Sequence, residues 1–206
     1  MITLDILPSK IYKFEYDDNK SLKTLVDDLK VKIIEKEKNN FRVNNARPKT
    51  IIFDCDEYPT DFNIFLTDCI KFSLLKEKIK YKNFKIILNW MNLHEYSENI
   101  HGNHFHPNSI YSGVYYYETV ENDSIVFYEN DQKNKMIYDI LKTDFTAYYS
   151  KKQNVPVKDG ELLIFRSYFE HGVDKFYLNG NDRKRISFSF NVDLSGIGST
   201  ERLTYR

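Results

Sequence analysis

From Phe84 onward the sequence breaks into short segments of β-branched and aromatic residues separated by polar turns, and this pattern constrains the fold more than any other feature. In the first segment Phe84, Ile86 and Leu88 alternate with other residues, which is the two-residue period of a strand. Turn signals such as Pro107-Asn108 and Asp159-Gly160 separate later segments. We expect strands at about 84–93, 101–106, 111–119, 124–129, 136–140, 145–149, 161–166 and 184–192. About eight short strands in succession favour a closed or double-layer antiparallel structure.

The chain before Phe84 has a helical rather than a strand period. Apolar residues recur three or four positions apart from Leu22 to Ile34 and again from Phe62 to Ile79, so each stretch predicts an amphipathic helix. Short strands are expected at 10–14 and 50–53. The sequence therefore predicts an α+β fold, in which the N-terminal helices pack on one face of an antiparallel sheet.

Length and charge limit the organisation and the partners of the chain. With 206 residues, 41% of them hydrophobic, we expect one domain made of N-terminal elements at 1–83, a β core at 84–192 and a loose tail at 193–206. The formal net charge is zero, which gives no reason to expect nucleic acid or a membrane as a partner. The pair Cys55 and Cys69 has no metal-type spacing, and the first residues have no apolar signal core, so we expect a reduced, cytoplasmic protein. Nothing in the composition decides the oligomeric state, and a homodimer stays open.

Two histidines one residue apart, His104 and His106, lie in one of the predicted strands. Alternate residues of a strand share a face, so both imidazoles point the same way. His171 lies in a later segment and can complete a three-imidazole site for Fe, Zn, Cu or Ni. The alternative is that these are structural or surface histidines, which is the interpretation we give to His94 and His101.

The last predicted strand has a polar face. Its alternate residues Arg185, Ser187, Ser189 and Asn191 are polar, whereas the residues between them are apolar. If this face looks into the β core, the Arg185 guanidinium needs an anionic partner, because an unpaired buried charge is costly. A carboxylate of a dicarboxylic acid suits a guanidinium, with the Ser187 hydroxyl assisting. The alternative is an arginine that reaches solvent from an edge strand.

Three motifs in this order resemble a known family. They are H-x-H-P-x-S-x-x-S-G-V-Y-Y from His104, D-G-E-L-L-I-F-x-S-x-x-x-H-G-V from Asp159, and R-x-S-x-S-F-N from Arg185. The segment from about Ile87 to Val192 resembles the Fe(II)- and 2-oxoglutarate-dependent dioxygenases, in particular small oxygenases of phages and bacteria that are distantly similar to prolyl hydroxylases. The resemblance implies a double-stranded β-helix, or jelly roll, with iron at its mouth. If a phage encodes the chain, the expected compartment is the host cytoplasm.

The resemblance also implies roles for single residues. His104 matches the first iron ligand and His171 the distal one. Arg185 matches the residue that binds the distal carboxylate of 2-oxoglutarate, with Ser187 beside it. Tyr116 matches a tyrosine that supports the same carboxylate, although it can equally be a core residue. A further co-substrate contact is expected from Asn89.

The sequence departs from the family at His106, because the family usually has a carboxylate two residues after the first histidine. We expect His106 to bind the metal as a third neutral nitrogen. The alternative is that His106 points away and that water or a carboxylate such as Glu118 or Asp174 completes the site.

The reaction implied by the resemblance is the hydroxylation of a C–H bond with O2 and 2-oxoglutarate, which releases succinate and CO2. The substrate, a small molecule or a peptide, cannot be deduced, since specificity in such folds lies in loops such as 92–102 and 129–135. Two other functions stay open on the sequence: a cupin-like metalloenzyme with three histidines and no 2-oxoglutarate, and a jelly-roll binding module without turnover.

Overall fold

A computed structural model describes residues 10–38, 48–95, 101–128, 152–173 and 184–195. In chain order the elements are β1 (Ile11–Glu15), η1 (Asn19–Leu22), α1 (Lys23–Lys38), β2 (Lys49–Ile52), η2 (Cys55–Glu57), α2 (Thr60–Lys76), β3 (Asn83–His94), β4 (His101–His104), β5 (Tyr111–Glu118), β6 (Ser124–Tyr128), β7 (Lys152–Pro156), β8 (Glu161–Arg166), β9 (Glu170–Val173) and β10 (Arg185–Ser195).

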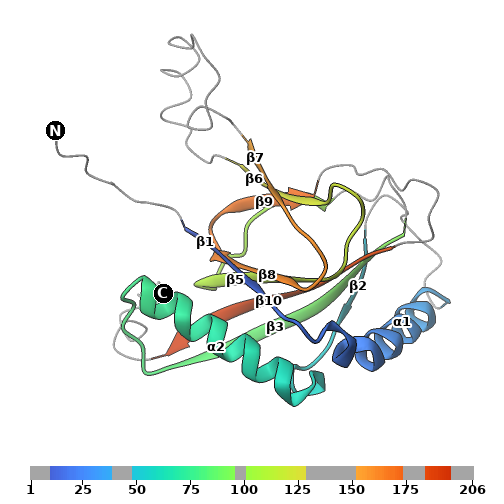
Figure 1. Ribbon diagram of the computed structural model, residues 1–206, viewed down its shortest axis with the longest axis horizontal. Helices are drawn as coiled ribbons and strands as arrows, with labels where there is room; N and C mark the ends of the chain where they lie inside the picture. The colour runs from blue at the N-terminus through green and yellow to red at the C-terminus, as the bar shows by residue number, and fades with distance from the viewer. Residues whose placement is uncertain (1–9, 39–47, 96–100, 129–151, 174–183, 196–206) are drawn as a thin grey trace, which may run out of the picture.

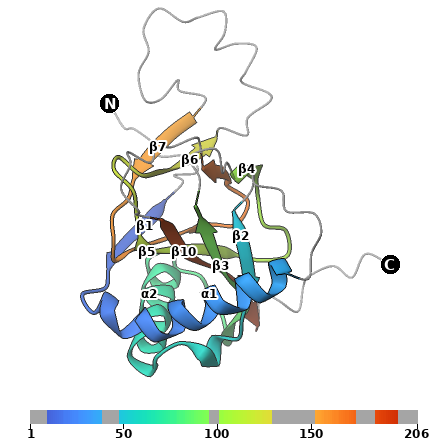
Figure 2. The same cartoon turned by 90° about the vertical axis from the view of Figure 1, so that its right-hand side faces the viewer.

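The strands form two antiparallel sheets. The larger sheet has the order β1-β8-β5-β10-β3-β2, and the smaller sheet has the order β4-β9-β6-β7. Figure 1 shows α1 and α2 on one side of the larger sheet and the smaller sheet on its other side, and the turned view of Figure 2 shows the same order of layers. No helix in the described ranges is long and apolar enough to cross a membrane.

The alternation of residues along β10 explains these layers. Ile186, Phe188 and Phe190 belong to the apolar core shared with the helices. That core includes Leu25 and Leu29 from α1 and Phe62, Leu66 and Ile70 from α2. Burying a large apolar side chain contributes roughly 1.5–3 kcal/mol, so this face holds the helices against the sheet. The opposite, polar face of β10 looks toward the smaller sheet.

A second, smaller core lies between the two sheets. Its buried members are Val114, Tyr116, Ile125, Phe127, Val157, Leu163 and Phe165. These residues alternate along β5 and β8 with residues of the helix-side core, as a strand buried on both faces requires. The polar residues of β10 lie beside this apolar cluster and line a hollow.

The α+β class and the predominance of antiparallel strands confirm the main expectation from the sequence. Strands β3, β4, β5, β6, β8 and β10 match six of the predicted segments, and β1 and β2 match the two N-terminal ones. The predicted strands at 136–140 and 145–149 lie outside the described residues. β7 and β9 were not predicted. The second helix ends at Lys76 rather than near Ile79, and β10 runs through Ser195 into the segment expected to be a loose tail.

Candidate metal centre

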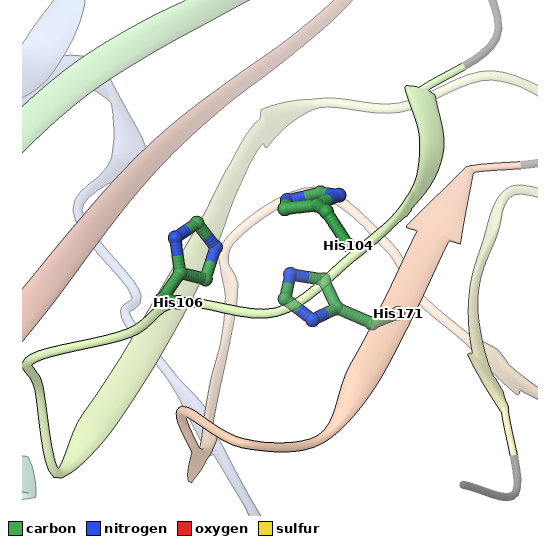
Figure 3. Close-up of side chains that lie close together, drawn as sticks. All are labelled: His104, His106 and His171. Carbon is green, nitrogen blue, oxygen red and sulfur yellow. The ribbon is translucent and has the colours of Figure 1, made fainter.

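Three histidines converge in the hollow between the sheets. His104 on β4 is the cross-strand partner of His171 on β9, and His106 follows two residues after β4 ends. One ring nitrogen from each histidine lies within 4.8 Å of those of the other two. Figure 3 shows the three rings turned toward a common point. The expected pairing of His104 and His106 with a distant His171 is therefore present in the fold.

The two short strands approach closely because β9 carries a glycine next to the ligand. A Cβ atom at Gly172 would lie 2.7 Å from the backbone oxygen of His101 on β4, which is too close for any side chain. Strand β4 ends at His104. His106 therefore does not reach the site by strand alternation, as the sequence had led us to expect. Its backbone N–H instead donates to the Ser167 carbonyl at 2.9 Å, which holds the segment beside the loop before β9.

Burial keeps the imidazoles of His106 and His171 neutral. Burial, together with the nearby His104, lowers the pKa of His106 to about 4. Burial also lowers the pKa of His171 to about 3, although a backbone hydrogen bond to Phe169 opposes the shift. A neutral imidazole has a nitrogen lone pair available for a metal ion. At neutral pH His106 and His171 therefore carry no extra proton that a metal ion would have to displace.

Backbone carbonyls orient two of the three rings. His104 Nδ1 lies 2.8 Å from the Gly102 oxygen, and His171 Nδ1 lies 2.8 Å from the Phe169 oxygen. A carbonyl oxygen only accepts hydrogen bonds, so in a neutral ring Nδ1 carries the proton and Nε2 keeps its lone pair. Both rings are thus held in the form that binds a metal through Nε2.

Arg185 lies in the same hollow, which encloses about 410 Å³ including its open mouth and is also lined by Ser187 and Tyr116. The Arg185 side chain is only 2% exposed. Its Nε donates to both carboxylate oxygens of Asp123, at 3.0 and 2.8 Å. Burial raises the pKa of Asp123 while the Arg185 guanidinium acts to lower it. The guanidinium that lines the hollow is therefore already paired with one buried carboxylate.

Tyr116 stands beside this ion pair. The guanidinium carbon of Arg185 lies 5.2 Å from the centre of the Tyr116 ring, within the range of a cation–π contact. The Tyr116 hydroxyl is buried and has no hydrogen-bond partner among the described residues. Burial raises the pKa of this phenol well above its usual value, so the hydroxyl is protonated and can donate. A buried donor without a partner calls for an acceptor in the hollow.

Other sequence-predicted residues lie elsewhere. Asn89 faces the helices, where its Nδ2 lies 2.7 Å from the Cys55 sulfur, and it does not line the hollow. Asn92 and Trp90 on the same strand do. Glu118 is outside the metal-ligand group of the described residues, and Asp174 lies beyond the described ranges.

Two functional features were missed from the sequence. Asp123 was noticed only as part of a turn, because nothing in its surroundings reveals a partner 62 residues away. His101 was interpreted as a structural histidine, yet its ring stacks on His104 with centroids 4.5 Å apart and an interplanar angle of 16°, and it lines the hollow. Its place three residues before His104 could have suggested this, because the register shift between His101 and His104 brings the two neighbouring rings together.

A family model described as "Putative 2OG-Fe(II) oxygenase" matches residues 89–191, which is half of the chain. The chain belongs to this family. The matched segment contains His104, His106, His171 and Arg185. Fe(II) and 2-oxoglutarate, the cofactors expected from the sequence, are those of the family. No curated protein sequence matches the chain.

Solved structures show the same fold at low sequence identity. A collagen prolyl hydroxylase of Paramecium bursaria Chlorella virus-1, in complex with 2-oxoglutarate, is 10% identical with a TM-score of 0.57, covering 88% of this chain and 94% of the viral one. HygX of Streptomyces hygroscopicus, with nickel and 2-oxoglutarate bound, is 10% identical with a TM-score of 0.53, covering 90% and 83%. The epimerase SnoN from nogalamycin biosynthesis is 11% identical with a TM-score of 0.57, covering 96% and 86%. The oxygenase therefore has the fold of 2-oxoglutarate-dependent enzymes whose reactions differ.

Proposed function

We propose that this oxygenase binds Fe(II) through His104, His106 and His171 and binds 2-oxoglutarate against Arg185, Ser187 and Tyr116. It then hydroxylates a C–H bond of a small-molecule or peptide substrate, with release of succinate and CO2. The observation that carries this proposal is the presence of three converging imidazoles and a buried guanidinium in one hollow. The two facing antiparallel sheets support the jelly roll expected from the sequence.

The histidine group fits an iron ion. Imidazole nitrogen is a common ligand of divalent iron, and iron oxygenases of this class usually combine two histidines with a carboxylate. Here the third position is the neutral His106, whose ring turns toward the other two. The three ligands leave the full double charge of the ion to be balanced by the dianionic co-substrate. This electrostatic balance supports a ligand set without a protein carboxylate.

The other part of the hollow fits the distal carboxylate of 2-oxoglutarate. Arg185 supplies a buried positive charge, Tyr116 supplies a hydroxyl donor without a partner among the described residues, and Ser187 supplies a second hydroxyl. Charge-assisted hydrogen bonds of this type contribute about 1.5–3 kcal/mol each. Because Asp123 holds Nε of Arg185, the rest of the guanidinium is oriented before the ligand arrives.

When bound, iron and 2-oxoglutarate supply the oxidising chemistry with O2, and the protein binds, orients and shields them. The His171 ring packs edge-on against Phe165 with centroids 4.8 Å apart, and the His106 ring lies 5.5 Å from that of Trp90. These aromatic walls limit water around the ligand nitrogens. The same walls fix the ring planes, so the ligands need little rearrangement when the metal binds.

The proposal is tested by metal and co-substrate binding. His171→Ala should abolish tight Ni(II) binding, because it removes the ligand that joins β9 to the site. In Ni(II)-loaded protein, Arg185→Ala should weaken 2-oxoglutarate binding about 10- to 100-fold in calorimetry. Lys184→Ala is the matched control, since Lys184 is the neighbouring cation and pairs with Glu95 outside the hollow. Unchanged affinity in Arg185→Ala would remove the role assigned to Arg185.

Product analysis separates this proposal from a cupin-like metalloenzyme and from a binding module. With Fe(II), O2 and 2-oxoglutarate, the oxygenase should form succinate, and His171→Ala should not. Tight metal binding without any affinity for 2-oxoglutarate would favour the cupin-like alternative. Failure of the wild-type protein to bind Fe(II), Ni(II) or Zn(II) would favour a binding module.

A further inference from the structure

His106 differs from the other two candidate ligands in what its Nδ1 atom meets. In His104 and His171 that atom faces a backbone carbonyl, which fixes the proton on Nδ1. In His106 it faces the side-chain amide of Asn191, with Asn191 Nδ2 at 3.4 Å. An amide offers a donor at one end and an acceptor at the other. The tautomer of His106 is therefore set by the way in which the Asn191 amide is turned.

A short chain of buried hydroxyls continues from the amide. Ser112 Oγ lies 2.8 Å from Asn191 Oδ1 and 3.0 Å from Ser167 Oγ. All three residues are buried. Each hydroxyl both donates and accepts, so the chain can run in either direction with every polar atom paired. Running one way, Ser112 donates to the amide oxygen and the amide nitrogen donates to His106 Nδ1.

In that direction the neutral His106 ring carries its proton on Nε2, and neither ring nitrogen has a lone pair for a metal. A half-turn of the amide reverses the chain. His106 Nδ1 then donates to Asn191 Oδ1, Asn191 Nδ2 donates to Ser112 Oγ, and Ser112 donates to Ser167 Oγ. No atom loses its partner, and Nε2 of His106 gains the lone pair that a metal requires.

We propose that Asn191 is a positioning residue for His106: in the metal-loaded protein its amide oxygen accepts the Nδ1 proton, and Ser112 and Ser167 take up the amide nitrogen. This inference rests on the metal site of the proposed function. The Nε2 lone pair of His106 is then available only when the hydrogen bonds through Asn191, Ser112 and Ser167 run in one of their two directions. In His104 and His171 a backbone carbonyl fixes the tautomer. The site therefore has two permanent ligands and one that is selected when the ion binds.

The closest isosteres of Asn191 separate this role from simple packing. Asn191→Asp has only acceptor oxygens, so it holds the proton on Nδ1 and should bind Co(II) at least as tightly as the wild type. Asn191→Leu keeps the branching at Cγ but offers no acceptor, and it should bind Co(II) about 10- to 100-fold more weakly, as is usual for the loss of a group that orients a ligand. Ser189→Ala is the matched control, because Ser189 lines the same face of β10 and bonds Asn92 rather than a histidine.

The experiment is a Co(II) titration of wild type and variants, followed by absorbance and calorimetry, with long-range ¹H–¹⁵N NMR of the histidine rings in Zn(II)-loaded wild-type protein. The expected spectrum has the His106 proton on Nδ1 and the metal on Nε2. The inference fails if His106 carries its proton on Nε2 in the Zn(II)-loaded protein, or if Asn191→Asp loses as much affinity as Asn191→Leu.

The NMR measurement uses the wild-type protein, so it tests the inference even if Asn191→Leu does not fold. The same measurements separate it from the proposed function. If the wild type binds neither Co(II) nor Zn(II), the metal site itself is wrong and both fail. If it binds both ions but Asn191→Leu matches the wild type, only the role of Asn191 fails.

Discussion

The buried ion pair between Arg185 and Asp123 makes the sharpest prediction about stability. The side chains of both residues are almost fully inaccessible, at 2% and 1%. Removing one member of such a pair leaves the other as an uncompensated buried charge, which costs about 3–5 kcal/mol. Asp123→Asn keeps the shape but removes the negative charge, so the metal-free variant should lose about 3 kcal/mol of unfolding free energy at pH 7.

The partner substitution is Arg185→Gln, which leaves Asp123 buried without its guanidinium. Burial already raises the pKa of Asp123, so without Arg185 this carboxyl takes up a proton more readily as the pH falls. The cost of Arg185→Gln should therefore be largest at neutral pH and smaller in acid. In the double variant both side chains are neutral amides, so its loss should be at least about 2 kcal/mol less than the sum of the two single losses.

The assay is urea unfolding of the metal-free proteins followed by circular dichroism, with linear extrapolation to water. Glu15→Gln is the control, because the ion pair between Glu15 and Lys158 is exposed at 2.7 Å separation. Exposed pairs of this kind contribute little, so this variant should match the wild type. If the losses of the two single variants add to within about 0.5 kcal/mol in the double variant, the two side chains are not coupled and the interpretation of the pair is wrong.

Three further predictions concern the frame of the site. Gly172→Ala should push β4 from β9, since its Cβ atom would meet a β4 carbonyl oxygen at 2.7 Å, and should weaken Ni(II) binding at least tenfold in calorimetry, a result that an unchanged affinity would contradict. Gly113→Ala should lower the unfolding free energy by about 1–3 kcal/mol in urea unfolding, because its Cβ atom would lie 2.2 Å from the Phe190 ring; equal stability would show that the ring moves freely. The metal-free protein should lose stability as the pH falls below about 6.5, because burial lowers the pKa of His94 to about 2 and that of His171 to about 3, so only the unfolded chain takes up these protons. Each of the two should contribute a loss of about 1–2 kcal/mol between pH 6.5 and pH 5, and a flat profile in urea unfolding at those pH values would contradict the assigned burial.

The sequence was informative where one segment carries its own signal. The polar face of β10 follows from strict alternation, and Arg185 and Ser187 lie on that face as predicted. The three histidines follow from their side-chain chemistry and their order along the chain. Asn89, expected from the resemblance to contact the co-substrate, lies on the face of β3 that meets Cys55, and β3 is buried on both faces beyond Leu88. Alternation of apolar and polar residues cannot distinguish two buried faces.

Features that depend on distant contacts could not be predicted. The strand β7, Lys152–Pro156, is polar and ends in proline, a composition that suits a sheet edge but also a loop. The strand β9, Glu170–Val173, is four residues long and has no period to detect. Asp123 and Asn191 acquire their roles only when β5, β6 and β10 meet, since each acts on a residue more than 60 positions away.

The pairing of His104 with His171 has a consequence for the edge of the smaller sheet. β4 is four residues long, and in the part of the chain that the structure describes it joins that sheet only through β9. An ion shared by the two histidines acts as a covalent-like cross-link between segments 67 residues apart, and such a link removes much of the entropy gained when an edge strand frays. Amide hydrogen exchange at His101–His104 should slow markedly once the ion is bound. Metal binding would then also hold the edge strand β4 in the sheet.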